Sequence, residues 1–177
     1  ALAPPTMRVN RLATTAVDLM PARRSGAIEQ VAEFARTDLL CYRAAHPADL
    51  AAEQARHWDP PLAWLEATHG IRLAVTTGLV PTRQDAAAVR RLADLVAARA
   101  DWRLVGLHGL TTATGSVVLG LMVEAGALAA DRAGDAALVD ERHERARWGE
   151  EQDALERERL LVAEVAAAGR FLAALQS

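Results

Sequence analysis

The sequence predicts a mainly α-helical fold: one multi-helix domain over residues 1–177, with one short strand or hairpin near residues 71–80. Hydrophobic residues make up 51% of the chain and aromatic residues only 4%, so Ala, Leu and Val must build the core. Ala and Leu are the strongest helix formers among the apolar residues. Apolar residues also recur at helical spacing along most of the chain, and 177 residues suit a single domain.

The first elements are expected to be two amphipathic helices and a short helical turn. Apolar residues at helical spacing from Val9 to Met20 predict a helix that ends near Pro21. Ser25 is placed to cap a second helix, because its hydroxyl can accept a bond from a backbone N–H of the first turn. Residues 39–43 suit one or two further helical turns.

Two helices separated at a proline pair are expected next. Pro47 can begin a helix that runs to Trp58, because the missing N–H of proline is harmless in a first turn. Asp59 is then expected to cap a separate helix, which ends at Gly70.

A short strand follows this glycine. Apolar and other residues alternate from Ile71 to Thr76, and such a strand must pair with Leu79-Val80 or with a segment outside this chain. Thr82 and Asp85 then form a capping-box pattern, which predicts the start of the next helix.

The second half of the chain predicts three more helices. They cover Trp102–Thr112, Val117–Ala130 and roughly Glu150–Leu175. The middle segment is apolar on nearly all sides and is expected to be the central core helix. It is shorter than the ~20 residues that a membrane-spanning helix needs, so we expect no stable membrane insertion.

Composition and charge exclude several classes of function. The net charge is −3, whereas a nucleic-acid-binding domain would carry a basic stripe, so no nucleic-acid partner is expected. All 20 basic residues are arginine. The absence of lysine excludes a Walker A phosphate loop and a lysine Schiff base.

The residues carry no enzyme or metal signature either. The one cysteine, Cys41, cannot form an internal disulfide or a multi-cysteine zinc site, and is expected to be a buried apolar residue. The five histidines are scattered, and no two lie four residues apart. Ser116 lies outside the G-x-S-x-G pattern of hydrolase nucleophiles. We therefore expect no enzyme, no metal and no cofactor.

Glu124 is the one charge in the apolar segment. A carboxylate in such a place needs a partner, and Arg132 or another arginine is the expected one. The alternative is a helical module that binds a small ligand in a pocket near Glu124.

Residues 140–159 have the highest charge density in the chain, with eight acids and five arginines. The spacing of Glu141 from Arg145, and of Arg147 from Glu151, predicts ion pairs along a solvated helix face. Trp148-Gly149 interrupts this face. Trp and Arg are enriched at interface hot spots, so a partner-binding surface is predicted here. Its candidate residues are Glu141, Arg147, Trp148, Glu150, Glu151 and Asp153.

A set of landmarks recurs in one order along about 150 residues. They are Arg11-Leu12-Ala13, Asp38 to Ala44, Pro47, Leu50, Gln54, Trp58-Asp59-Pro60, Trp64, Thr77-Gly78, Gly106-Leu107-His108, Gly115-Ser116 to Gly120-Leu121 and Trp148-Gly149. Each is weak alone, but the ordered set resembles an assembly-chaperone family of F-type ATP synthase, whose members bind the unassembled alpha subunit of the catalytic head.

This resemblance implies a chaperone that is not an ATPase and that keeps the free alpha subunit from aggregating until it pairs with beta. It places a functionally required acid of the family at Glu141. It also implies that the chain is the C-terminal helical domain of an α+β protein whose mostly β N-terminal domain is absent here. We expect a bacterial, cytoplasmic monomer without a secretory signal; eukaryotic relatives would lie in the mitochondrial matrix.

Overall fold

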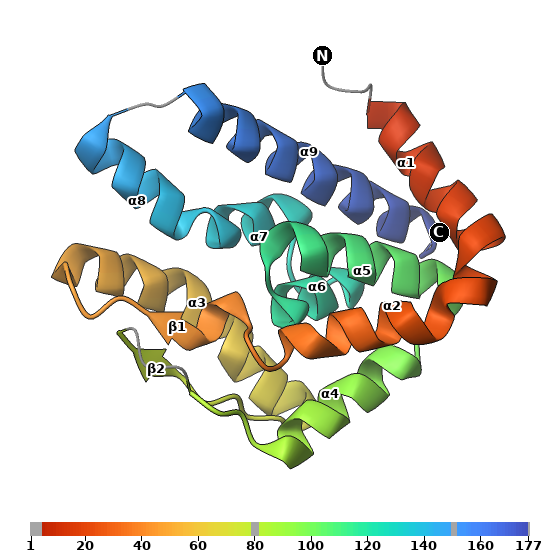
Figure 1. The fold of residues 1–177 in the computed structure, drawn as a ribbon, viewed down its shortest axis with the longest axis horizontal. Coiled ribbons are helices and arrows are strands. Elements are labelled where there is room, and N and C mark those ends of the chain that lie inside the picture. Colours follow the sequence, from red (N-terminus) through yellow and green to blue (C-terminus); the bar gives the residue numbers. More distant parts are fainter. Residues whose placement is uncertain (1–4, 79–81, 150–151, 177) are drawn as a thin grey trace.

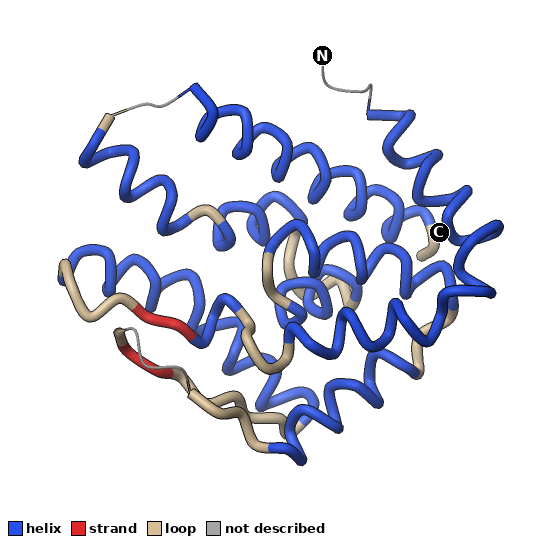
Figure 2. The backbone as a smooth tube through the Cα atoms, in the orientation of Figure 1, coloured by secondary structure: helices blue, strands red, loops and turns tan. Residues whose placement is uncertain are grey.

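The computed structural model describes residues 5–78, 82–149 and 152–176. This part of the chain is mainly α-helical with one two-stranded sheet, as the sequence predicts (Figures 1 and 2). The helices are α1 (Pro5–Thr14), α2 (Met20–Phe34), α3 (Ala48–His69), α4 (Ala86–Ala97), α5 (Asp101–Thr114), α6 (Val117–Glu124), α7 (Ala130–Ala137), α8 (Val139–Trp148) and α9 (Gln152–Ala174). The strands are β1 (Tyr42–Arg43) and β2 (Thr76–Thr77).

Helices α5 and α6 form the centre, with α2, α3, α7 and α9 packed around them (Figure 1). Every residue of α6 is buried. Gly120 allows its close approach to α5, because an added Cβ there would lie 2.8 Å from Thr111 Oγ1 and 2.9 Å from Leu107 Cδ1. The segment is therefore the core helix that the sequence predicts. It ends at Glu124 and not at Ala130, because the chain turns at Gly126, which has a φ of +72°.

The junction between α1 and α2 differs from the prediction of two separate helices. A π-helical turn, Thr15–Leu19, leads from α1 directly into α2, and Figure 1 shows that the chain bends there. Pro21 has no N–H, so the hydrogen-bond ladder is interrupted at this point in any case, and one wide turn accommodates the gap without ending the helix. Ser25 lies inside α2 and caps nothing.

Helix α3 is continuous, so the predicted break at Asp59 is wrong. It contains Pro60 and Pro61, each of which removes an intrahelical hydrogen bond. Packing compensates, because one face of α3 is buried along its length and the indole Nε1 of Trp58 donates to the carbonyl oxygen of Ala136 (2.7 Å). Gly70, with a φ of +63°, ends the helix as predicted.

The segment that begins at Asp38 is bound to the start of α6. The carboxylate of Asp38 is fully buried and accepts bonds from Leu40 N (3.1 Å), Ser116 Oγ (3.0 Å) and Val118 N (3.3 Å). Residues 39–41 form the predicted helical turn, of the 3₁₀ type, but residues 42–43 form β1 instead. The buried carboxylate thus fixes the start of α6.

Two of the sequence landmarks meet directly in the fold. The guanidinium of Arg43 lies 5.2 Å from the ring of Trp58, and its Nη2 lies 2.8 Å from Asp59 Oδ1. Cys41, beside these residues, is completely buried, as predicted. These landmarks therefore hold the fold together.

The small sheet is parallel, with Tyr42 opposite Thr76 and Arg43 opposite Thr77. The strand was expected over residues 71–76, but only its end pairs. At Ala74, before β2, the side chain of Gln84 makes the backbone hydrogen bonds that a neighbouring strand would make. It accepts from Ala74 N (2.7 Å) and donates to Ala74 O (2.8 Å). The expected pairing with Leu79-Val80 lies outside the described residues.

The predicted capping box before α4 is only partly right. Asp85 is the cap, and its carboxylate accepts from Ala87 N (3.1 Å). Thr82 lies three residues too early for that role. α7 and α8 are separate short helices between the core helix and α9.

Candidate partner-binding surface

The predicted binding residues lie on α8 and near the start of α9 (Figure 1). α8 packs on α3, and its last residue before the connection to α9 is followed by Gly149. Gly149 has a φ of +97°, which favours glycine, and its N–H donates to Arg145 O (3.0 Å). The end of α8 that carries Trp148 therefore lies at the periphery of the molecule.

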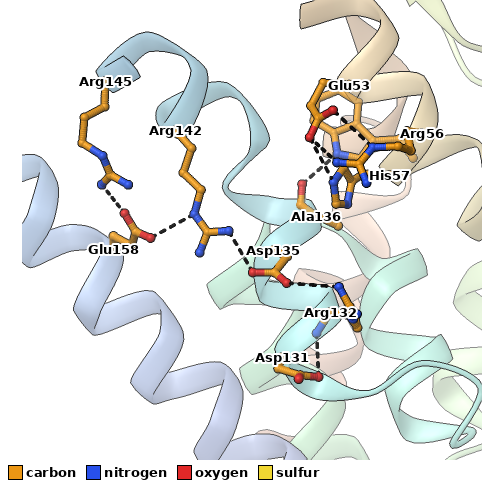
Figure 3. A network of polar contacts seen from close by, with 11 residues as sticks. Glu53, Arg56, His57, Asp131, Arg132, Asp135, Ala136, Arg142, Arg145 and Glu158 are labelled. Atoms are coloured by element: carbon orange, nitrogen blue, oxygen red, sulfur yellow. Dashed lines mark hydrogen bonds and ion pairs between the residues drawn. The ribbon is translucent and has the colours of Figure 1, made fainter. Parts of the chain in front are cut away.

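An ion network holds α8 to α7 and α9 (Figure 3). Arg142 donates through Nη1 to Asp135 Oδ1 of α7 (2.8 Å) and through Nε to Glu158 Oε1 of α9 (3.0 Å). Arg145 pairs with the same Glu158 carboxylate. The hydrogen bond from Arg145, assisted by Arg142, lowers the pKa of Glu158, so this carboxylate stays charged and bridges the helices.

A buried glutamine fixes the first turn of α8. Gln54 of α3 is only 2% exposed. Its Oε1 accepts from Ala44 N (2.8 Å), and its Nε2 donates to Asp140 Oδ1 (2.7 Å). One side chain thus connects the segment after β1, α3 and α8, and it sets the orientation in which α8 presents Glu141.

Glu141 is exposed, and its carboxyl is not used in the network. The predicted pairing with Arg145 is wrong, because Arg145 bonds to Glu158. Partial desolvation is the main reason that the pKa of Glu141 is raised; Asp140, Glu158 and Glu144 add to this effect, and Arg157 opposes it. An acid held near other acids gains from an approaching cation.

Trp148 has the most exposed large apolar side chain among the described residues, at 80%. The guanidinium of Arg147 lies 5.8 Å from the centroid of its ring, within the range of a cation–π contact. Trp and Arg are the residue types most enriched at the energetic centres of protein interfaces. Trp148 is thus exposed, with Arg147 beside its ring, and their role as a partner-binding anchor stays a prediction.

Helical geometry brings three exposed residues of α8 to one face. Glu141, Glu144 and Trp148 follow i, i+3, i+7 spacing, and together they form the α8 stripe. Asp153 is exposed in the first turn of α9. Glu150 and Glu151 lie outside the described residues. The sequence did not predict that Gln54 and Glu158 position the α8 stripe. Gln54 is one of the landmarks of the family resemblance, but its position alone indicates no function.

Glu124 is 4% exposed and has two arginine partners. It accepts from Arg103 Nη1 (2.7 Å) and from Arg99 Nε (3.1 Å). The prediction of an arginine partner is confirmed, although Arg132 is not that partner. His108, on the same helix as Arg103, faces Gln30 (3.0 Å). With both carboxylate oxygens occupied, Glu124 has a structural role, which disfavours the alternative of a ligand pocket around it.

Neither metal ligation nor membrane insertion finds support in the described ranges. No group of three or more His, Cys, Asp or Glu side chains within them could hold a metal ion. No helix within them is long and apolar enough to cross a membrane.

A helical domain with an exposed tryptophan and arginine among charged residues is typical of proteins that bind other proteins. Comparison with known proteins places it among the chaperones. The family model of the ATP12 chaperone protein matches residues 1–66. The crystal structure of Atp12 from Paracoccus denitrificans superposes with a TM-score of 0.92 at 30% identity, over 97% of this chain and 74% of that one.

Further solved structures agree. A mutant of P. denitrificans Atp12p gives the same TM-score and identity. A putative chaperone from Agrobacterium tumefaciens matches with a TM-score of 0.88 and 32% identity, over 98% of this chain and 65% of that one. The chain belongs to the ATP12 chaperone family. The family expected from the landmarks, that of the ATP synthase assembly chaperones, is thereby confirmed.

Proposed function

We propose that this protein binds the free alpha subunit of F-type ATP synthase and keeps it from aggregating until it pairs with the beta subunit. It acts by binding alone, as a monomer in the bacterial cytoplasm, without catalysis, a cofactor or a nucleic-acid partner. The observation that carries this proposal is the 80% exposure of Trp148 on an acidic helix face, in a chain of the ATP12 family.

The α8 stripe and its neighbours are the proposed client-binding residues. Trp148 and Arg147 supply the anchor, because a rigid aromatic ring buries a large area at a small entropic cost. Glu141 supplies a carboxylate that a cation of the client would stabilise. Asp153 extends the acidic surface to the first turn of α9. Glu150 and Glu151, which lie outside the described residues, are proposed as client-binding residues from the sequence alone.

An unassembled subunit exposes apolar surface that its neighbour would later cover, and such surface promotes aggregation. A chaperone that covers this apolar surface must release the subunit when the correct neighbour arrives, so its affinity for the subunit has to be moderate. A surface of one aromatic anchor surrounded by solvated charges suits this requirement, since charged contacts at the rim of an interface affect rates and specificity more than affinity.

The test is light scattering of denatured alpha subunit diluted into buffer, without nucleotide, in the presence of the chain or its variants. We expect the wild type to suppress aggregation near one-to-one stoichiometry. Trp148→Ala and Glu141→Arg should each lose most of this suppression, because one removes the apolar anchor and the other repels the cation.

Matched controls are Val17→Ala, which truncates an apolar side chain 57% exposed on the π-helical turn, and Glu29→Arg, which reverses an exposed charge on α2. Both should protect the alpha subunit as the wild type does. The proposal for the surface fails if Trp148→Ala and Glu141→Arg bind as the controls do, and the proposed client fails if the wild type gives no suppression.

A further inference from the structure

A groove of about 530 Å³ lies between α3 and the α7–α8 segment, on a different side of α8 from the α8 stripe. We call it the α3–α8 groove. Its α3 wall consists of Asp49, Glu53, Arg56 and His57, and its α7–α8 wall of Arg132, Asp135, Val139, Arg142 and His143. Every lining residue except Val139 is titratable.

Ion pairs form between residues of the same wall, and Arg142 also pairs with Glu158 of α9 (Figure 3). On the α3 wall, Glu53 pairs with Arg56 and lies 3.4 Å from His57 Nε2. On the α7–α8 wall, Asp135 pairs with Arg142 at 2.8 Å and with Arg132 at 3.9 Å. Among the described residues, no ion pair crosses the groove from one wall to the other.

The two walls carry opposite net charge. With neutral histidines, the α3 wall has two carboxylates, Asp49 and Glu53, against one guanidinium. The α7–α8 wall has two guanidiniums, Arg132 and Arg142, against one carboxylate. Extending this wall to Arg145 and Glu158 adds one charge of each sign and leaves the excess unchanged. The groove is therefore acidic on one side and basic on the other.

This lining does not suit an apolar small molecule. Small-molecule pockets of about 300–1,000 Å³ are lined mostly by apolar and aromatic side chains with a few polar groups. Here the lining is almost wholly charged, and the outer groups remain solvated: the side chains of Arg56 and Arg132 are 67% and 71% exposed. Such a groove favours an occupant that carries its own complementary charges.

We propose that the α3–α8 groove is a second docking surface for the client, and that it binds a client segment with a basic and an acidic side chain on one face. The basic side chain lies against Asp49 and Glu53, and the acidic side chain lies against Arg132. Charge complementarity argues for this occupant, because a segment of one sign would be repelled by one of the two walls. The groove and the α8 stripe lie on two sides of the same helix, so a client that extends around α8 would contact both. This inference rests on the function proposed above.

The test measures the affinity of the alpha subunit for charge-reversed variants at about 0.1 M and 1 M salt, where the screening length falls from about 10 Å to about 3 Å. Arg132→Glu and Asp49→Arg should each weaken binding by about tenfold at the lower salt, since like charges placed together oppose docking. The difference should largely disappear at the higher salt.

Controls separate this effect from folding and from general charge. Arg90→Glu, on the exposed face of α4, makes a matched reversal away from the groove and should bind as the wild type does. Asp49 also accepts from Leu50 N (3.0 Å). Asp49→Asn, which retains an acceptor there, therefore serves if Asp49→Arg fails to fold; it should also weaken binding at low salt.

The outcomes are distinct. Wild-type affinity for the groove variants, with binding still sensitive to Trp148→Ala, would overturn the groove and leave the proposed function standing. Weaker binding by Arg132→Glu together with tighter binding by Asp49→Arg would overturn the two-sign occupant, because it would indicate a purely acidic segment. No binding by the wild type would overturn the proposed function itself.

Discussion

The buried carboxylate of Asp38 makes the stability of this fold depend on pH in a direction opposite to that of most carboxylates. The side chain is fully buried, and burial raises its pKa from 3.8 to about 6, although hydrogen bonds from Leu40, Ser116 and Val118 oppose the shift. Replacing Asp38 by Asn removes the ionisation and nearly preserves the shape. It should also remove this pH dependence.

The size of the effect follows from the two pKa values. In the unfolded chain the group ionises near pH 3.8, and in the folded chain near pH 6. Each pH unit between them costs about 1.4 kcal/mol of folding free energy. The penalty is nearly absent below pH 4, grows as the pH rises, and is complete above pH 6 at roughly 3 kcal/mol. Between pH 4.5 and 7 the expected loss is roughly 2 kcal/mol.

The assay is urea unfolding of the wild type and Asp38→Asn at several pH values in this window. In Asp38→Asn, the NH2 group of the amide faces a backbone N–H that donated a hydrogen bond to the carboxylate, so this bond is lost. The free energy of unfolding of the variant should therefore be lower by a constant amount of about 1–3 kcal/mol. The stability of the wild type relative to the variant should therefore fall by roughly 2 kcal/mol from pH 4.5 to 7. Parallel curves would refute the reasoning, since they would mean that Asp38 is not desolvated.

Three further predictions address packing, reactivity and the ion network. Gly120→Ala should destabilise by about 1–3 kcal/mol in urea unfolding, because side chains of α5 lie 2.8 and 2.9 Å from the added Cβ; Gly26→Ala, in α2 with nothing within 4 Å, should instead stabilise by about 0.5–1 kcal/mol. Burial raises the pKa of Cys41 to about 12, so the thiol should react with a thiol reagent only after unfolding; rapid labelling of the native protein would contradict this. Glu158→Gln should speed amide hydrogen exchange in α8 and leave exchange in α5 unchanged, because it weakens the ion pairs with Arg142 and Arg145. Glu156→Gln, the control at an exposed residue, should change exchange in neither helix. Equal exchange in the two variants would contradict the role of Glu158 in holding α8.

The predictable part of the fold is the part that local sequence determines. The core helix, the α3 terminus at Gly70 and the helical class follow from apolar spacing and from the backbone freedom of glycine. Two errors in the helix boundaries occur at Pro21 and at Pro60-Pro61. There, the rule that proline ends a helix is overridden by a π-helical turn in one case and by burial around Trp58 in the other. Neither compensation is visible in a single stretch of sequence.

The candidate site divides in the same way. The composition of residues 140–159 predicts a solvated helix face around Trp148, and the structure shows that the Trp148 side chain is exposed. The pairing of charges was not predictable, because Arg145 finds Glu158 thirteen positions away in place of Glu141, four positions away. The two partners lie on consecutive helices, α8 and α9, and the angle between these helices must be known before such a pair can be seen. The role of Gln54 depends in the same way on the distant Asp140.

The means by which α8 is held in place bears on how a chaperone can release its client. Among the residues of α8, all of which the structure describes, only Val139 is buried, whereas every residue of α6 is. α8 is thus held by the Gln54–Asp140 bond and by the bridges of Arg142 and Arg145 to Glu158. Elements with few buried apolar contacts open at a lower free energy than the core does. We therefore expect that a competing subunit which disturbs these few polar contacts can move the proposed client-binding surface while the packed core around α5 and α6 stays intact.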